Sequence, residues 1–211
     1  MSAAERLLYF FGRPLVRSFY RVTPLGLENL PDGGFLLVPN HITWVDALIL
    51  QLTCPRPIRY VIDQEYYHKR ILHPILRTIG CIPISKRQSH AAVRAAAEKI
   101  AEGEIVCVFP EGELERRGAL LRLQRGYEVI ARHAKAQVVP VWLDQLWGSI
   151  FSFQGGKFFR KFLSQITAER RRRAEQFCPA QAAMIDSIDH RCGEGSALQT
   201  AHAVFGKMPI Q

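Results

Sequence analysis

Long apolar runs are missing from this sequence. No stretch approaches the roughly 18 to 20 apolar residues that a membrane-spanning helix needs. The N-terminal region also fails as a secretory signal, because Arg13, Pro14 and Arg17 interrupt its apolar stretch. We therefore expect neither a transmembrane helix nor a secretory signal within the sequence.

The five cysteines lack the pattern of a disulfide framework or of a zinc site. Their number is odd, no Cys-x-x-Cys occurs, and no pair of histidines lies near them. Cys81 and Cys107 lie in apolar, strand-like segments, which predicts small buried core residues. This cysteine usage fits a reducing, cytoplasmic compartment. The sequence predicts no metal site and no bound cofactor.

Acidic residues are scarce relative to basic ones. The 211 residues include 19 Asp and Glu but 28 Lys and Arg, a formal net charge of +9. A surface of this sign favours anionic lipid headgroups, nucleic acid or an acidic carrier protein. Nucleic acid is not expected, because no recognition fold or base-stacking pattern accompanies the basic charge. The length suits one domain with a real core.

Apolar strand-like segments alternate with helical patterns along most of the chain. The pattern predicts strands over residues 35–38, 58–62, 105–109 and 138–143, a turn into a strand over 80–84, and a short strand with a turn over 25–34. It predicts helices from residue 46, over 64–79 with a break near His73-Pro74, and over 89–101 and 120–135. This alternation indicates an α/β fold with a mixed, largely parallel central sheet flanked by helices.

Residues 4–20 are rich in aromatic side chains and arginines, and a helix is expected there. Leu8, Phe11 and Leu15 fall near helical spacing, and Pro14 predicts a kink or a break into two short helices. An apolar face flanked by arginines suits a membrane interface. The alternative is a helix packed on the core of its own domain.

Polar residues follow the strand predicted at residues 35–38. The chain turns at Asn40 and presents His41, and Asp46 follows at the start of a predicted helix. An imidazole can act as a general base when a carboxylate fixes its tautomer and stabilises its charge. His41 and Asp46 are therefore candidate catalytic residues. The alternative is a capping histidine with a surface aspartate, since this spacing alone is a weak signal.

Charged residues also lie at two other predicted strand ends, where α/β proteins bind ligands. Cations there would bind phosphate, and arginine would do so with forked contacts. The strand ends therefore indicate acid–base chemistry on an anionic substrate, with His41 deprotonating a hydroxyl. If that hydroxyl attacked an acyl carbonyl, the reaction would be acyl transfer, and backbone N–H groups at a helix start would be candidate oxyanion donors. The charged residues are Lys86 and Arg87 after residues 82–84, and Glu111, Arg116 and Arg117 after residues 105–109.

Four segments occur in a recognisable order and spacing. They are Asn40-His41-x-x-x-x-Asp46, Gly80-x-Ile-Pro-Ile-Ser-Lys-Arg87, Phe109-Pro110-Glu111-Gly112 and Val139-Pro140-Val141. Together they resemble the four blocks of the glycerolipid acyltransferases, which include the lysophosphatidic acid acyltransferases. The resemblance covers approximately residues 21–160.

The resemblance implies an acyltransferase of phospholipid biosynthesis or remodelling. Such an enzyme moves a fatty acyl group from acyl-CoA or acyl-carrier protein, as co-substrate, to the free glycerol hydroxyl of a lysophospholipid. By the same resemblance, His41 is the base and Asp46 orients it. The residues that receive an acceptor-binding role are Lys86, Arg87, Glu111 and Gly112.

The third segment departs from the commonest pattern of the family, which continues Glu-Gly-Thr-Arg. Here Leu114 stands at the position of that arginine, and the sequence follows Glu-Gly-x-Leu-x-Arg-x-Gly. This pattern resembles the lysophosphatidylethanolamine acyltransferase type of domain that is found in acyl-carrier-protein synthetase fusions. That alignment gives the phosphate-binding role to Arg116 and leaves the acceptor headgroup open.

The domain division follows from these patterns. Residues 1–21 form an interfacial helical segment, 22–163 the acyltransferase domain, 164–200 an unassigned basic insertion or loop, and 201–211 a late strand that returns to the domain. We expect peripheral attachment to an anionic membrane surface on the cytoplasmic side, and further fused domains in a longer protein are left open. The alternative function is a catalytically silent, membrane-binding relative, against which the intact His41–Asp46 pair argues.

Overall fold

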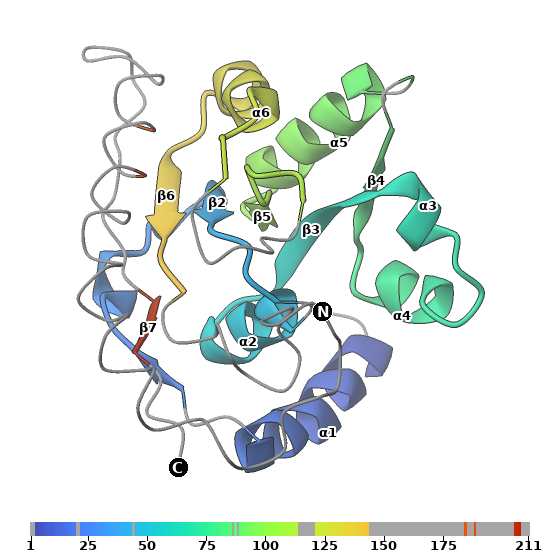
Figure 1. Ribbon diagram of the computed structural model, residues 1–211, viewed down its shortest axis with the longest axis vertical. Helices are drawn as coiled ribbons and strands as arrows, with labels where there is room; N and C mark the ends of the chain where they lie inside the picture. Colours follow the sequence, from blue (N-terminus) through green and yellow to red (C-terminus); the bar gives the residue numbers. More distant parts are fainter. Residues whose placement is uncertain are drawn as a thin grey trace.

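A five-stranded parallel sheet forms the centre of the computed structural model (Figure 1). The structure describes residues 3–19, 22–43, 45–85, 87, 89–113, 121–143, 184, 188 and 205–207. The strand order is β4-β3-β5-β2-β6. The strands are β2 (Phe35–Pro39), β3 (Ile58–Asp63), β4 (Ile82–Ile84), β5 (Ile105–Cys107) and β6 (Val138–Val141). The predicted α/β fold is confirmed, and these five strands are all parallel.

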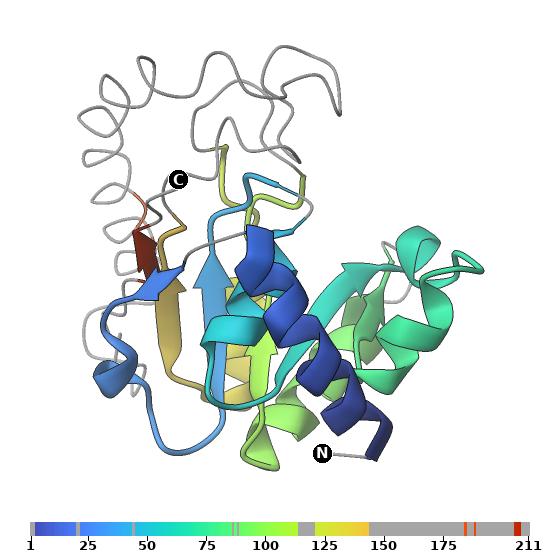
Figure 2. The same ribbon diagram turned by 90° about the horizontal axis from the view of Figure 1, so that it is seen from below.

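Helices cover both faces of this sheet (Figures 1 and 2). One face packs against α5 (Ser89–Ala101) and α6 (Gly126–Ala134), and the other packs against α2 (Asp46–Thr53) and α4 (His73–Thr78). With both faces covered, every residue of β2 is buried. This burial explains why the central strand is a continuous apolar run in the sequence.

The N-terminal helix α1 (Ala3–Phe19) packs against α2 on the outer side of that layer. It stays one helix through Pro14, so the predicted break is wrong. Phe10 and Pro14 are both exposed, so water can satisfy the carbonyl that loses its N–H partner at the proline. Across the residues that the structure describes, no helix is long and apolar enough to cross a bilayer.

Near the chain ends, a strand is present within the predicted late segment 201–211, whereas the strand expected over 25–34 is replaced. A strand is found at β1 (Thr23–Pro24), where it pairs antiparallel with β7 (Phe205–Lys207). The strand expected within residues 25–34 is absent from this described stretch, because Gly26 takes a left-handed φ of 76° and starts the short helix η1 (Leu27–Asn29). Most of the predicted insertion at 164–200 lies outside the described residues.

One helical region breaks close to where the sequence predicts, and another is shorter than expected. The region predicted over 64–79 with a break near His73-Pro74 is formed by α3 (Gln64–Tyr67) and α4, which begins at His73 and has Pro74 in its first turn, where proline is tolerated. The helix predicted from residue 120 begins only at Gly126. Its expected first residues instead donate backbone N–H groups elsewhere, Gln124 to the Pro110 carbonyl at 2.6 Å and Leu121 to a carboxylate at 2.9 Å.

The two cysteines expected in the core are buried, as the sequence predicts. Cys81 and Cys107 are buried free thiols in the core. Burial raises the pKa of Cys81 to about 11 and that of Cys107 well above its ordinary value. Both thiols therefore stay protonated and act as packing groups.

Candidate active site

The turn after β2 is attached to the end of β6 by one side chain. Asn40 is buried, its amide nitrogen donates to the Leu143 carbonyl at 3.1 Å, and its amide oxygen accepts from the Leu143 N–H at 2.6 Å. A third bond runs from the Asn40 N–H to the Val141 carbonyl at 3.3 Å. The sequence indicates a turn at Asn40 but not this contact, because its partner lies 103 positions away. These bonds fix where the next residue, His41, projects.

Asp46 is the buried centre of the turn. Its Oδ2 accepts from the backbone N–H of Ile42 at 2.6 Å and of Thr43 at 2.8 Å, and its Oδ1 accepts from the Thr43 hydroxyl at 2.5 Å. Asp46 is also the first residue of α2, where a negative charge is favoured by the helix dipole. These donors offset the cost of burying a carboxylate, and they fold the turn around it.

His41 is the fourth donor to this carboxylate. Its Nδ1 lies 2.9 Å from Asp46 Oδ2, and about a fifth of its side chain (20%) is exposed. Because the ionised carboxylate can only accept, Nδ1 carries the proton and Nε2 is left without one. The partly exposed imidazole can therefore take a proton at Nε2 while Asp46 stabilises the charge that forms.

Aromatic rings hold the imidazole from one side. The His41 ring stacks on Phe109, with centroids 4.0 Å apart and an interplanar angle of 24°, and Phe109 lies 6.4 Å from the Tyr60 ring. The buried Tyr60 hydroxyl donates to the Ala47 carbonyl in the first turn of α2 at 2.6 Å. The stack limits rotation of His41, and the sequence signal for Phe109 is its place directly before Pro110-Glu111-Gly112.

Glu111 joins the β5 end to the β2 end. Its buried carboxylate accepts from the His41 N–H at 2.7 Å through Oε1 and from the Leu121 N–H at 2.9 Å through Oε2. The resemblance implies an acceptor-binding role for Glu111, but both of its carboxylate oxygens already bind backbone N–H groups. In this geometry Glu111 is a clamp that positions the backbone of His41.

Gly112 makes the sharp turn that follows. Its φ of 70° is left-handed, a region that favours glycine, and its N–H donates to the Phe109 carbonyl at 3.2 Å. A Cβ at this position would meet the side chain of Gln124 at 3.4 Å. Gly112 therefore has a backbone reason to be glycine, independent of any substrate contact.

The expected oxyanion donors are not the N–H groups of this turn. Those of Ile42 and Thr43 are bonded to Asp46, and that of His41 is bonded to Glu111. These three groups precede α2, which begins at Asp46, so the expectation of oxyanion donors at a helix start stays a prediction. Their role is to shape the turn.

The predicted cations are only partly described. Arg87 is exposed and follows β4, the edge strand, with β3 and β5 between that strand and β2. The structure thus brings Glu111 to His41 and leaves Arg87 at the far edge of the same end of the sheet. Lys86 and Arg116 lie outside the described residues. In the described part of the chain, no group of three or more His, Cys, Asp and Glu could hold a metal ion.

The geometry of the turn is that of a general-base site. A histidine at a strand end, oriented by a buried carboxylate and partly open to solvent, is suited to removing a proton from a nucleophile. The chain belongs to the Acyltransferase family, whose model matches residues 21–144. That match contains the whole of the turn at His41 and both of its clamps.

Similar proteins carry one recurrent name. A 1-acyl-sn-glycerol-3-phosphate acyltransferase of Bacillus subtilis is 32% identical over 116 residues, covering 54% of this chain and 57% of the relative. A chloroplastic protein of the same name from Arabidopsis thaliana is 26% identical over 130 residues, covering 59% of this chain and 36% of the relative. The chain thus spans a little over half of one relative and about a third of the other.

A solved structure shares the fold. The 1-acyl-sn-glycerophosphate acyltransferase PlsC of Thermotoga maritima aligns with a TM-score of 0.53 and 23% identity. The alignment covers 63% of this chain and 54% of that one. At this identity the likeness supports the architecture of the sheet and its helices.

The clamp role of Glu111 predicts the effect of Glu111→Gln. An amide replaces one accepting oxygen with a donor, so the N–H of His41 or of Leu121 loses its partner. We expect a loss of unfolding free energy of about 1–3 kcal/mol without any substrate present. Hydrogen exchange at the two amides should also speed up. Glu113→Gln, at an exposed position, is the matched control. Unchanged stability and exchange in Glu111→Gln would contradict the clamp.

Proposed function

We propose that this chain transfers a fatty acyl group from a thioester to the free hydroxyl of 1-acylglycerol-3-phosphate. The observation that carries the proposal is the Nδ1–Asp46 bond, which leaves His41 Nε2 as a base at the end of β2. Membership of the Acyltransferase family and the shared name of the relatives supply the reaction and the acceptor. The donor is acyl-CoA or acyl-carrier protein.

The reaction needs one proton to move twice. His41 Nε2 takes the hydroxyl proton as the acceptor oxygen attacks the thioester carbonyl, and Asp46 stabilises the imidazolium. When the tetrahedral intermediate collapses, the carbon–sulfur bond breaks and the proton passes to the leaving thiolate. The products are the diacyl phospholipid and the free thiol of the carrier. Phe109 keeps the ring plane fixed through both transfers.

The acceptor phosphate is assigned to the basic residues that follow β4 and β5. Arg87 and Arg116 are the principal candidates, with Lys86 beside them, since guanidinium groups bind phosphate in a forked geometry. The relatives favour 1-acylglycerol-3-phosphate as the acceptor. The Glu-Gly-x-Leu-x-Arg pattern favours lysophosphatidylethanolamine as the second acceptor to test.

We also assign peripheral membrane attachment to α1, because this helix has its polar side inward. Glu5 is buried and Tyr9 is half-buried, whereas Phe10 is 71% and Phe11 66% exposed. Burial, reinforced by Glu5, raises the pKa of Tyr9, so its hydroxyl stays neutral there. Figure 2 shows α1 running from the end where the strands begin toward the end where they finish. An exposed apolar face beside arginines suits anionic headgroups, at the cytoplasmic face where the cysteines stay reduced.

His41→Ala tests the proposed chemistry. Turnover should fall by about 10²- to 10⁴-fold, because the general base is lost. The fold should survive, since Asp46 keeps its bonds to Ile42 and Thr43. The assay measures acyl transfer to 1-acylglycerol-3-phosphate and to lysophosphatidylethanolamine, each with acyl-CoA and with acyl-carrier protein. His90→Ala, an exposed position on α5, is the control. Parent-like turnover in His41→Ala would sink the mechanism.

Arg87→Ala and Arg116→Ala test the phosphate assignment. Each should raise the KM for the phosphorylated acceptor by roughly tenfold, the scale of one charge-assisted contact, with little effect on the KM for the donor. Arg94→Ala is the control, since its side chain is exposed and lies beside Glu98 at 4.0 Å. A change confined to donor kinetics would show that these arginines do not bind the acceptor.

The exposed face of α1 is tested by Phe10→Ser combined with Phe11→Ser. Removing both rings should weaken binding to phosphatidylglycerol-containing vesicles by on the order of tenfold or more, because attachment scales with buried apolar area. Val129→Ser removes a half-exposed apolar side chain from α6, on the opposite layer, and should not change binding. If the Phe10→Ser, Phe11→Ser variant co-sedimented with vesicles as well as Val129→Ser does, the assignment of membrane attachment to α1 would be contradicted.

A further inference from the structure

A second exposed apolar surface lies on the same layer of the molecule as α1. It is formed by residues 68–77, which connect α3 to α4 and include most of α4; we call them the α3–α4 segment. Ile71 is 83% exposed and Ile75 45% exposed, and Leu72 between them is also exposed. Aliphatic side chains at a helix start and in the turn before it are not needed for the core of this domain.

Basic residues surround these aliphatic side chains. Lys69, Arg70 and Arg77 are all exposed. The nearest acidic residues on the N-terminal side are Asp63 and Glu65 in and before α3, and residues 66–97 contain six Lys or Arg but no Asp or Glu. The same pattern occurs around α1, since residues 6–27 contain four arginines and no acidic residue.

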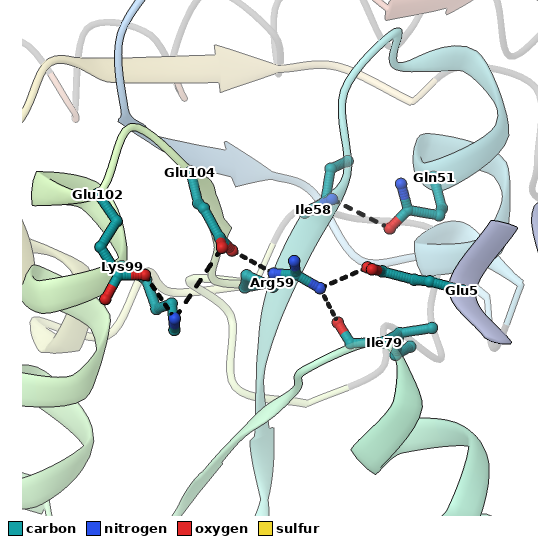
Figure 3. Close-up of polar contacts among 8 residues, drawn as sticks. All are labelled: Glu5, Gln51, Ile58, Arg59, Ile79, Lys99, Glu102 and Glu104. Carbon is teal, nitrogen blue, oxygen red and sulfur yellow. Dashed lines mark hydrogen bonds and ion pairs between the residues drawn. The ribbon is translucent and has the colours of Figure 1, made fainter. Parts of the chain in front are cut away.

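One partly buried arginine joins α1 to α4 (Figure 3). A single nitrogen of Arg59, on β3, donates to Glu5 of α1 at 2.5 Å and to the carbonyl of Ile79, directly after α4, at 2.7 Å. Its Nε donates to Glu104, before β5. Burial alone would lower the pKa of Arg59, but the bonds to Glu104 and Glu5 outweigh that effect and raise it. The guanidinium therefore stays charged and holds the two helices in fixed relation.

Space for this guanidinium is made by a glycine. Gly80 has a left-handed φ of 68°, and a Cβ there would meet the Arg59 terminal nitrogen at 3.0 Å. Figure 1 shows α1 and α4 on the side of the sheet opposite α5 and α6. The two apolar surfaces thus belong to one side of the molecule, and the partly buried Arg59–Glu5 ion pair connects them.

We propose that the α3–α4 segment is a second contact with an anionic bilayer surface. It rests on the membrane attachment that we assign to α1 under the proposed function. Ile71, Leu72 and Ile75 enter the interfacial region, and Lys69, Arg70 and Arg77 meet lipid phosphates. The occupant is a lipid surface because exposed aliphatic side chains are flanked by basic residues, with no acidic residue among them, and this composition complements an anionic bilayer. Two contacts would orient the domain on the membrane as well as attach it.

Co-sedimentation with vesicles tests this proposal. Ile71→Ser combined with Ile75→Ser should weaken binding to vesicles of phosphatidylcholine with phosphatidylglycerol by about three- to tenfold, as buried apolar area is lost. Lys69→Gln combined with Arg70→Gln should weaken binding to these vesicles but not to pure phosphatidylcholine. Val129→Ser is the apolar control and Arg94→Gln the basic control, both on the opposite layer. Thermal unfolding should match the parent in all four proteins.

The outcomes distinguish a failure of the second contact from a failure of membrane attachment by α1. If the isoleucine variant binds like Val129→Ser while the phenylalanine variant of α1 loses binding, the α3–α4 proposal is wrong and the attachment by α1 stands. If neither variant loses binding, the membrane attachment itself is wrong. If the parent is a dimer in solution and the isoleucine variant is a monomer, the segment is an interface between copies of the chain, which also overturns the proposal.

Discussion

The site depends on one buried carboxylate. Asp46 accepts from two backbone N–H groups, a hydroxyl and the His41 imidazole. A buried charge is tolerated only when hydrogen bonds replace water, so these donors and the carboxylate require one another. The turn cannot rearrange without leaving the charge unsatisfied. The same bonds that fold the turn therefore fix the tautomer and direction of the histidine.

Topology supplies the rest of the support. The order β5-β2-β6 places β2 between two neighbours, and each neighbour contributes one clamp at its carboxyl end. Asn40 binds the backbone after β6, and Glu111, after β5, binds the backbone of His41. These partners are 103 and 70 positions apart in sequence. A rigid frame of parallel strands thus holds a short turn whose own residues could not fix its position.

The sequence predicted the elements that depend on local pattern. Apolar runs identified the buried parallel strands, and the turn residues placed His41 and Asp46 together after one of them. It did not predict what depends on distant partners. Leu121 and Gln124 were expected in a helix, but their N–H groups are bonded to Glu111 and Pro110. Periodicity also located an apolar face on α1 without showing that Glu5 faces inward, because an amphipathic pattern does not say which side meets the core.

The most direct test is nitrogen-15 NMR of the neutral His41 ring. Because Nδ1 is hydrogen-bonded to Asp46, we expect a proton on Nδ1 and none on Nε2. Asp46→Asn should disturb this preference, and the His90 ring should be unaffected. A wild-type His41 with its proton on Nε2 would contradict the account, because that nitrogen could then not accept the proton of a hydroxyl.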